Sequence, residues 1–370
     1  MSDKTVPGAI SRPLHVGSPN ILDRSIFLKR VERILDQKMF SNDGPLVREL
    51  ETSVAERLDI PHVIAVSNAT IGLELVLETF PKKGEIILPS FTFVATAHAV
   101  KRMGFTPVFS DVTSDFGLLD PEQVKRLITP KTVALLPVNV YGNICDIDAL
   151  TRISCEHSLK LIFDSAHVLG VRHKGIYAGT FGQAEVFSLH ATKFINGFEG
   201  GLIATTDEDL AAALRRARNF GFVGYDQVNS IGTNAKLSEI HAAMALTNFE
   251  HFEEIIRHNK RIHDAYKRRL PSWMQLIGFP VHTESNFQYV VARCSGLKRD
   301  PLVKYLHGHR VLVRRYFYPG VHRMAPYSDD HHHLPVTEEL SESVICLPTG
   351  QDINEDTVSY ICDLIAEFDG

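Results

Sequence analysis

The chain has 370 residues, of which 44% are hydrophobic and 22% charged, as in an ordinary soluble globular protein. This length exceeds what one core usually supports, so we expect a large domain and a smaller one. The net charge of −5 argues against a nucleic-acid-binding protein, and no stretch approaches the ~20 apolar residues that a membrane helix needs.

The cysteines and the first residues indicate the compartment. The five cysteines are scattered, without a CxxC pair or a zinc-like spacing, which favours reduced thiols in a cytoplasmic protein. Residues 1–24 contain no continuous apolar segment, so we interpret them as a tail and not as a signal peptide.

Helices and strands are then expected to alternate. Apolar residues at helical spacing predict helices at Phe27–Met39 and Leu46–Leu58. Further strands are expected at His62–Val66, Glu85–Pro89, Thr106–Ser110, Thr132–Val138 and Lys160–Asp164, with helices at Ile71–Thr79, Ala95–Met103, Pro121–Ile128 and Ile147–His157. Short apolar strands separated by helices predict an α/β fold with a mainly parallel sheet covered by helices. Ligands of such sheets bind beyond the carboxyl ends of the strands.

The remaining elements are expected to complete this domain and form a smaller α+β domain. They are strands at Val186–Leu189 and Leu202–Thr206, a helix from Asp207 to about Asn219, a long connecting helix from Leu237 to about Leu270, a strand at Phe287–Val291, a helix at Asp300–His307 with Asp300 as N-cap and Pro301 in the first turn, a strand at Val344–Leu347 and a helix at Glu355–Phe368. The predicted division is a tail (1–24), a large domain (25–250) and a small C-terminal domain (251–370).

Two of the predicted strand ends carry polar residues that suit a ligand. At Ser67-Asn-Ala-Thr70 a strand passes into a helix, whose free amides and dipole favour an anion such as a phosphate; a plain N-cap by Asn68 or Thr70 is the alternative. At Asp164 a buried-looking strand ends in a carboxylate, which needs a partner. That partner is either a protonated pyridine nitrogen, or else a helix N-cap or an arginine.

The third strand end leads to Lys193. This lysine follows the strand that contains Ser188 and precedes a turn with Gly197, Gly200 and Gly201. A desolvated lysine can form a Schiff base with an aldehyde, whereas an ordinary surface lysine is the alternative. A phosphate cradle, an acid for a ring nitrogen and an amine for an aldehyde are together the three attachments that pyridoxal phosphate requires.

The run His331-His332-His333 does not predict a metal site. Adjacent histidines cannot all face one ion, and the neighbouring Asp329-Asp330 favours an exposed loop.

An ordered set of motifs resembles the sugar aminotransferases, which are fold type I pyridoxal-phosphate enzymes of the aspartate aminotransferase superfamily. The motifs are Ser67-Asn-Ala-Thr70, Pro89-Ser-Phe-Thr-Phe-Val-Ala-Thr-Ala97, Pro107-Val-Phe-Ser-Asp-Val112, Asp164-Ser-Ala-His167, Gly179-Thr-Phe-Gly182, Ser188-Leu-His-Ala-Thr-Lys193 and Glu199-Gly-Gly201. The resemblance covers about residues 15 to 365 with the motif order kept.

The resemblance implies a role for each matching position. Lys193 would form the Schiff base and shuttle a proton, and Asp164 would pair with the pyridinium nitrogen. The implied cofactor-binding residues also include Ser188 with the amides of Ala69 and Thr70 at the phosphate, Phe93 on the ring face, and His167 beside the ring hydroxyl.

Other matching positions imply a partner subunit and a sugar site. Asn234 matches an asparagine that the family donates to the phosphate across a dimer interface, so a homodimer is expected. Tyr316 and His322 match a loop near the sugar, although a packed aromatic loop is an equal alternative. Two departures stand out: Ala69 where Gly is common, and Asn139 where members often have His, which would tune substrate choice.

The expected function is therefore a transamination from glutamate to a nucleotide-linked keto sugar. Within the family, Leu14–Asn20, Ser41–Pro45 and His190–Phe194 look most like the branch that forms 4-amino-4,6-dideoxyglucose from dTDP-4-keto-6-deoxyglucose. The rivals are a 3-aminotransferase of a 3-keto sugar, a sugar dehydratase on the same scaffold, which Lys193 and the scattered cysteines oppose, and a non-catalytic regulator, which the retained Lys193, Asp164 and Ser188 oppose.

Overall fold

The structure is a computed structural model that describes residues 12–294, 296–328 and 333–368. Residues 1–11 of the predicted tail, and most of the histidine-containing loop, lie outside the described residues. Of the rest of that tail, Leu14–His15 form strand β1, which pairs in parallel with β14 (Val311–Leu312).

The central sheet has seven strands in the order β2-β10-β9-β6-β5-β3-β4. Their bounds are β2 His62–Val66, β3 Glu85–Pro89, β4 Thr106–Ser110, β5 Thr132–Leu135, β6 Lys160–Asp164, β9 Ala184–Ser188 and β10 Gly201–Thr205. Strands β9, β6, β5, β3 and β4 pair in parallel, whereas β10 is antiparallel to both of its neighbours. The predicted mainly parallel sheet is confirmed.

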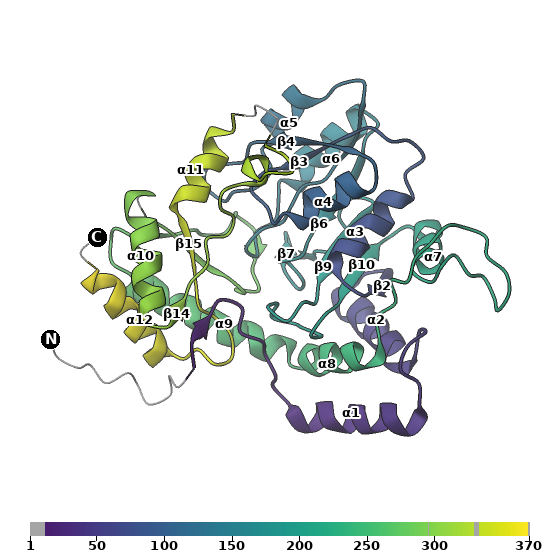
Figure 1. The fold of residues 1–370 in the computed structure, drawn as a ribbon, viewed down its shortest axis with the longest axis horizontal. Coiled ribbons are helices and arrows are strands. Elements are labelled where there is room, and N and C mark those ends of the chain that lie inside the picture. The colour runs from purple at the N-terminus through teal and green to yellow at the C-terminus, as the bar shows by residue number, and fades with distance from the viewer. Residues whose placement is uncertain (1–11, 295, 329–332, 369–370) are drawn as a thin grey trace.

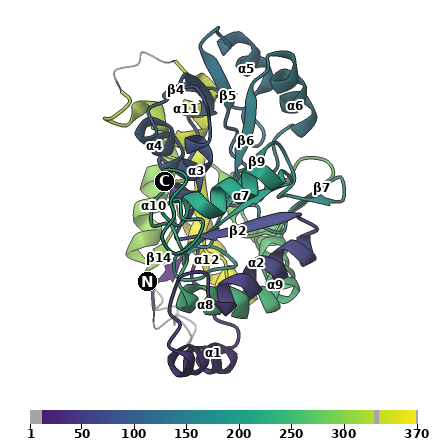
Figure 2. The ribbon, with the colours of Figure 1, turned by 90° about the vertical axis from the view of Figure 1, so that its right-hand side faces the viewer.

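Helices cover both faces of this sheet, as Figures 1 and 2 show. The helices up to residue 269 are α1 Arg24–Gln37, α2 Pro45–Leu58, α3 Ala69–Glu78, α4 Ala95–Arg102, α5 Pro121–Leu127, α6 Ile147–Glu156, α7 Glu208–Ala217, α8 Glu239–Glu250 and α9 Phe252–Arg269. Side chains of successive strand residues point to opposite faces. Phe163 therefore joins one core with α2 and α8, while Ile162 joins the other with α3, α4 and α7.

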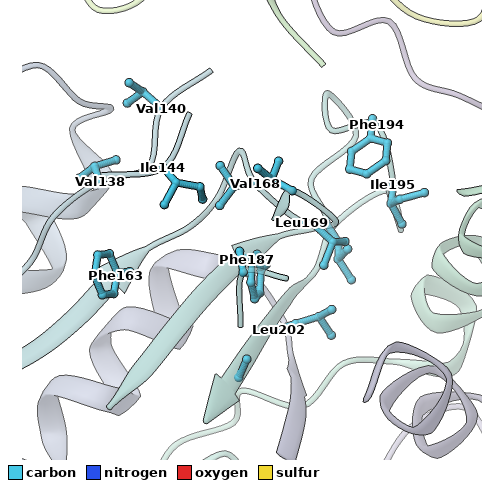
Figure 3. Packing of buried hydrophobic residues seen from close by; sticks show 14 of the residues in the cluster. Val138, Val140, Ile144, Phe163, Val168, Leu169, Phe187, Phe194, Ile195 and Leu202 are labelled. Atoms are coloured by element: carbon cyan, nitrogen blue, oxygen red, sulfur yellow. The ribbon is translucent and has the colours of Figure 1, made fainter. Parts of the chain in front are cut away.

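The core on the α8 side reaches the lysine turn. Figure 3 shows buried side chains of this core, among them Phe163, Phe187 and Leu202 of the sheet, and the same core includes Phe194 and Ile195, which directly follow Lys193. Because Leu189 before Lys193 and Phe194 and Ile195 after it are all buried, the turn that carries the lysine is anchored on both sides.

A third core lies against a smaller antiparallel sheet of β11 (Gln275–Leu276), β13 (Val290–Arg293) and β15 (Val344–Leu347). Helices α9, α10 (Gly296–Gly308) and α12 (Glu355–Glu367) surround it. The other elements are β7 Arg172–His173, β8 Ile176–Tyr177, β12 Thr283–Glu284, the 3-10 turn Val321–Arg323 and α11 Pro335–Ser343. The predicted boundary at residue 250 stays a prediction.

Some predicted element bounds were wrong. The long helix predicted from Leu237 breaks at His251 into α8, which is buried in the core beside the central sheet, and α9, which packs against α12. The predicted strand at Phe287–Val291 starts at Val290 instead.

The start of α10 was also predicted wrongly. This helix begins at Gly296, so Pro301 lies inside it and Asp300 is not its N-cap. The Asp300 carboxylate instead pairs with the guanidinium groups of Arg299 and Arg315.

None of the helices in the described part of the chain is long and apolar enough to cross a membrane.

Candidate active site

A cavity of about 840 Å³ lies where several parallel strands end. Its lining includes residues after β2 and β3 and the last residues of β6 and β9. Of the residues predicted for the site, those that line it are Ala69, Thr70, Phe93, Asp164, His167, Ser188, Lys193 and Tyr316. Segments far apart in the sequence thus converge on one space, as the strand-end argument predicted.

The turn between β2 and α3 presents backbone amides to this cavity. Asn68 is the N-cap of α3, and its side chain accepts a 2.9 Å hydrogen bond from the amide of Ile71. The amides of Ala69 and Thr70 belong to the first helical turn, where no intrahelical acceptor exists. The turn therefore combines the plain N-cap with an anion-binding end, and the two interpretations do not compete.

Gly201 allows a close approach to this turn. It pairs with Val66 of β2 and with Ser188 of β9. A Cβ atom at Gly201 would lie 2.7 Å from the amide nitrogen of Ala69, which is closer than atoms can pack. The glycine-rich segment after Lys193 therefore fits the sheet against the amide-bearing turn.

Asp164 ends β6 and is 7% exposed. Its Oδ2 accepts a 2.7 Å hydrogen bond from the Thr96 hydroxyl, and its Oδ1 accepts one of 3.2 Å from the amide of Ala166. Burial raises the pKa of the Asp164 carboxyl, while these hydrogen bonds and the Lys193 ammonium oppose the rise. No arginine or helix N-cap pairs with it among the described residues, and the lone pairs that remain suit a cationic N–H donor.

Lys193 is half-buried and follows β9 through a short turn, in which its amide donates to the carbonyl of His190 at 2.8 Å. Its Nζ lies 3.2 Å from the hydroxyl oxygen of Tyr289. Burial lowers the pKa of Lys193 to about 8, and the Asp164 carboxylate opposes this shift. A lysine in this state is a good nucleophile, unlike a surface lysine in a turn.

Two further predicted residues, Ser188 and His167, line the same cavity. Ser188 is the last residue of β9, and its Oγ accepts a 3.3 Å hydrogen bond from the amide of His190. His167 is 7% exposed, and burial, together with the Lys193 charge, lowers its pKa well below the ordinary value. The imidazole is therefore neutral.

Phe93 and Tyr316 line the cavity from segments that are far apart in the sequence. Phe93 precedes α4 and is 59% exposed, so its ring is free to contact a ligand. The carbonyl of Tyr316 accepts a hydrogen bond from the buried Tyr141 hydroxyl, which holds that loop in place.

Two predicted residues do not line the cavity. His322 is buried, with Nδ1 2.6 Å from the Ser90 Oγ and Nε2 3.2 Å from the Glu338 carboxylate. Asn234 is exposed on the loop after α7 and forms an isolated bridge with Asn219. A contact between Asn234 and this cavity would therefore have to come from another copy of the chain.

Sequence reasoning missed several lining residues and one buried contact. Tyr289 lines the cavity and directly precedes β13, where its sequence context is that of an ordinary core residue. Arg314 lines the cavity and is exposed. Thr96 donates a hydrogen bond to Asp164; it belongs to the Pro89–Ala97 motif, in which it was not singled out. Glu74 and Arg102, which also line the cavity, form a 2.7 Å ion pair.

No group of three or more His, Cys, Asp or Glu side chains in the described part of the chain could hold a metal ion.

The geometry fits pyridoxal 5'-phosphate. The amides of the turn before α3 and the Ser188 hydroxyl suit a phosphate, the Asp164 carboxylate suits a pyridinium N–H, and Lys193 suits an aldehyde. The missing Cβ of Gly201 preserves the close approach at the phosphate end.

Comparison with known proteins points the same way. The sequence profile described as the DegT/DnrJ/EryC1/StrS aminotransferase family matches residues 22–366. The chain is 32% identical over 374 residues to a dTDP-4-amino-4,6-dideoxy-D-glucose transaminase of Shigella dysenteriae, with 97% of this chain and 100% of the relative covered. It is 30% identical over 348 residues to a GDP-perosamine synthase of Escherichia coli O157:H7, with 91% and 94% covered.

Among solved structures, the chain resembles DesI, which was crystallised in the presence of its TDP-sugar product. The TM-score is 0.92 and the sequence identity 43%, with 97% of this chain and 93% of that chain covered.

Proposed function

Because the chain belongs to the DegT/DnrJ/EryC1/StrS aminotransferase family, we propose that it transfers an amino group from glutamate to C4 of a nucleotide-linked 4-keto-6-deoxy sugar. It is a sugar aminotransferase that depends on pyridoxal 5'-phosphate. The expected substrate is dTDP-4-keto-6-deoxyglucose, supported by the names of two curated relatives at 32% and 34% identity.

One observation carries the proposal, namely that Lys193, Asp164 and the turn before α3 face a single cavity. When bound, pyridoxal 5'-phosphate supplies an aldehyde for amine exchange and a ring that withdraws electrons from the reacting carbon. In our proposal the Asp164 carboxylate keeps the ring nitrogen protonated, and the Lys193 Nζ takes up and returns the proton of the substrate carbon.

The remaining cavity residues are proposed to bind and orient. The amides of Ala69 and Thr70, with Ser188, hold the phosphate, and the exposed ring of Phe93 covers the face of the cofactor ring. His167 and Tyr316 line the cavity; in our proposal His167 would lie beside the ring hydroxyl and Tyr316 would face the sugar. His322 would act on the sugar only indirectly, through the loop that it anchors to Ser90.

The cavity is large enough for more than the cofactor. Its lining also includes Glu74, His98, Arg102 and Arg314, which are polar groups suited to the sugar and its phosphates. A GDP-linked sugar is the second candidate, since a GDP-perosamine synthase is similar over 91% of this chain.

A homodimer is proposed as the active unit. The loop after α7 carries Asn234 together with exposed apolar side chains, including Tyr225 and Ile231. Figure 1 shows this loop extending away from the body of the molecule beside α7. Exposed apolar side chains on a projecting loop suit a partner subunit, and Asn234 would then reach the partner's phosphate.

A cytoplasmic location remains part of the proposal. The five cysteines are free thiols in the structure, which suits a reducing compartment.

The substrate test is direct. Purified protein loaded with pyridoxal phosphate is incubated with glutamate and either dTDP-4-keto-6-deoxyglucose, its 3-keto isomer or the GDP-linked 4-keto sugar, and the products are identified by mass spectrometry. We expect the 4-amino product from the dTDP sugar. Conversion of the 3-keto or GDP sugar alone would overturn the proposed substrate, and absence of a Lys193-dependent visible band would favour a non-catalytic regulator.

The dimer test uses two variants that are defective in different subunits. Lys193→Ala lacks the amine, and Asn234→Ala lacks the donated amide, so each alone has low activity. In a coexpressed mixture, hybrid dimers regain one intact cavity, and roughly a quarter of the wild-type sites should recover. No recovery in hybrids isolated by differential tags would contradict a shared site.

A further inference from the structure

The hydroxyl of Tyr289 lies between two site residues that the family motifs had already identified. Its Oη is 3.2 Å from the Nζ of Lys193 and 3.4 Å from the Nε2 of His167. The rings of Tyr289 and His167 also lie with their centroids 4.6 Å apart. These contacts form a chain of hydrogen-bonding groups that ends at the lysine amine.

The direction of the hydrogen bonds follows from His167. Its Nδ1 accepts a 3.2 Å hydrogen bond from the backbone amide of Tyr141, so Nδ1 carries no proton. Because the buried imidazole is neutral, its proton must be on Nε2. Nε2 therefore donates to the Tyr289 oxygen and occupies one of its acceptor positions.

The proton of the Tyr289 hydroxyl then needs an acceptor of its own. Burial raises the pKa of this phenol well above the ordinary value, so it remains protonated. Tyr289 is 4% exposed, and a buried hydroxyl that fails to donate is costly. The Gln288 side chain hydrogen-bonds this phenol, and a protonated Lys193 donates to its oxygen. When Lys193 is unprotonated, the lone pair of its amine is a further acceptor within reach.

We propose that Tyr289 is a positioning residue whose hydroxyl, oriented by the Nε2–H of His167, donates to the unprotonated form of Lys193, favours that form and holds the amine at the cavity. A neutral amine can act as a nucleophile and accept a proton, whereas an ammonium group can do neither. The inference rests on the proposed use of Lys193 as the reacting amine.

The other groups around this contact are few. Asp164 faces Lys193 and favours its charged form. The groups that face the phenol from neighbouring segments are Tyr141, Tyr316, Cys346 and Gln288. Of these, Tyr316 and Cys346 favour the protonated phenol, and only Gln288 opposes it.

The test measures the amine directly, without a substrate. In the full chain freed of cofactor, the rate at which acetic anhydride modifies Lys193 is followed by peptide mass spectrometry across the pH range around 8. The midpoint of this curve reports the amine pKa independently of reagent access. In Tyr289→Phe the midpoint should rise by roughly half to one pH unit, because a hydrogen bond to the neutral amine is lost.

Tyr141→Phe is the matched control. Tyr141 is also a buried tyrosine near Tyr289, but its hydroxyl donates to the carbonyl of Tyr316 and not to the lysine. We expect its midpoint to equal that of the wild type. A midpoint in Tyr289→Phe that falls or stays unchanged, with circular dichroism showing a folded chain, would overturn the inference.

The cofactor-bound enzyme gives a second readout. The pH at which its visible absorption band changes should move in Tyr289→Phe and not in Tyr141→Phe. If both titrations behave as expected but no sugar is aminated, the proposed function fails and this inference stands. If amination is found but neither titration moves, this inference fails and the proposed function stands.

Discussion

The hydroxyl of Thr96 donates a 2.7 Å hydrogen bond to Oδ2 of Asp164, which ties the first turn of α4 to the end of β6. Both groups are buried, and Thr96 is 0% exposed. The contact holds the carboxylate in place and favours its ionised form against the effect of burial.

Replacing Thr96 by Val should therefore shift activity toward higher pH. The variant keeps the shape of the side chain but loses the donor, so the pKa of Asp164 rises further. The carboxylate is mainly ionised only above its pKa. The acid limb of the pH profile of kcat/KM should therefore move to higher pH, and activity at pH values below this limb should fall roughly tenfold. Thr96→Ser keeps the hydroxyl and should behave as the wild type; an acid limb that does not move would show that the contact is not functional.

Replacing Lys193 by Met should lower the transamination activity and raise the stability of the cofactor-free protein. Transamination should fall by at least about a thousandfold, because the nucleophile and proton carrier are lost. Burial lowers the pKa of Lys193 from 10.5 to about 8, so the charged lysine destabilises the fold at every pH below 8. This cost disappears as the pH rises toward 10.5.

The cofactor-free Lys193→Met protein should thus melt higher than the wild type at pH 7, by roughly 1–3 °C for a half-buried side chain. The difference should shrink between pH 8 and 10.5. Differential scanning calorimetry at several pH values checks this, and a constant difference would refute the electrostatic explanation.

Replacing Gly201 by Ala should weaken cofactor binding. The new methyl group would lie 2.7 Å from the amide nitrogen of Ala69 and would push β10 and the start of α3 apart. We expect at least a tenfold increase in the dissociation constant of pyridoxal phosphate, measured by fluorescence titration, since a misplaced amide loses a charge-assisted hydrogen bond. Gly278→Ala, where a Cβ would meet no atom within 4 Å, should bind normally.

Replacing Glu185 by Gln should change how stability depends on pH. Glu185 is fully buried in β9 and accepts hydrogen bonds from the Ser165 hydroxyl and from the amides of Gly179 and Phe181. Burial raises its pKa from 4.5 to about 7, so its ionisation costs stability as the pH rises through this window.

The wild type should therefore lose stability relative to Glu185→Gln between pH 4.5 and 7. Glu185→Leu, which leaves two buried amides without an acceptor, should be destabilised by about 2–4 kcal/mol. Urea unfolding at several pH values measures both effects, and a Gln variant that follows the wild-type pH profile would contradict the titration of Glu185.

Much of the site could be predicted because strand ends are visible in the sequence. Val66, Asp164 and Ser188 end short apolar runs, and parallel strands bring their carboxyl ends together. The polar residues at or just after these ends line the cavity, and the α/β fold followed from the same alternation of strands and helices.

Other features depend on tertiary contacts that leave no local signal. Tyr289 reads as a core residue, because nothing beside it in the sequence indicates that a lysine lies at its hydroxyl. The break at His251 is invisible to helix periodicity, since both halves remain helical and only their packing partners change. Asp300 precedes Pro301 and so resembles an N-cap in the sequence, but its carboxylate forms ion pairs with Arg299 and Arg315.

The pairing of β1 with β14 has a consequence for the order in which the enzyme forms during synthesis. Leu14 emerges from the ribosome early but finds its partner, Val311, only after most of the chain has been made. The Lys193 and Asp164 side of the cavity belongs to the earlier segments, whereas Tyr289 and Arg314 arrive later. A nascent chain can therefore fold its central sheet before it has a complete active site, and catalytic competence is among the last properties that the protein acquires.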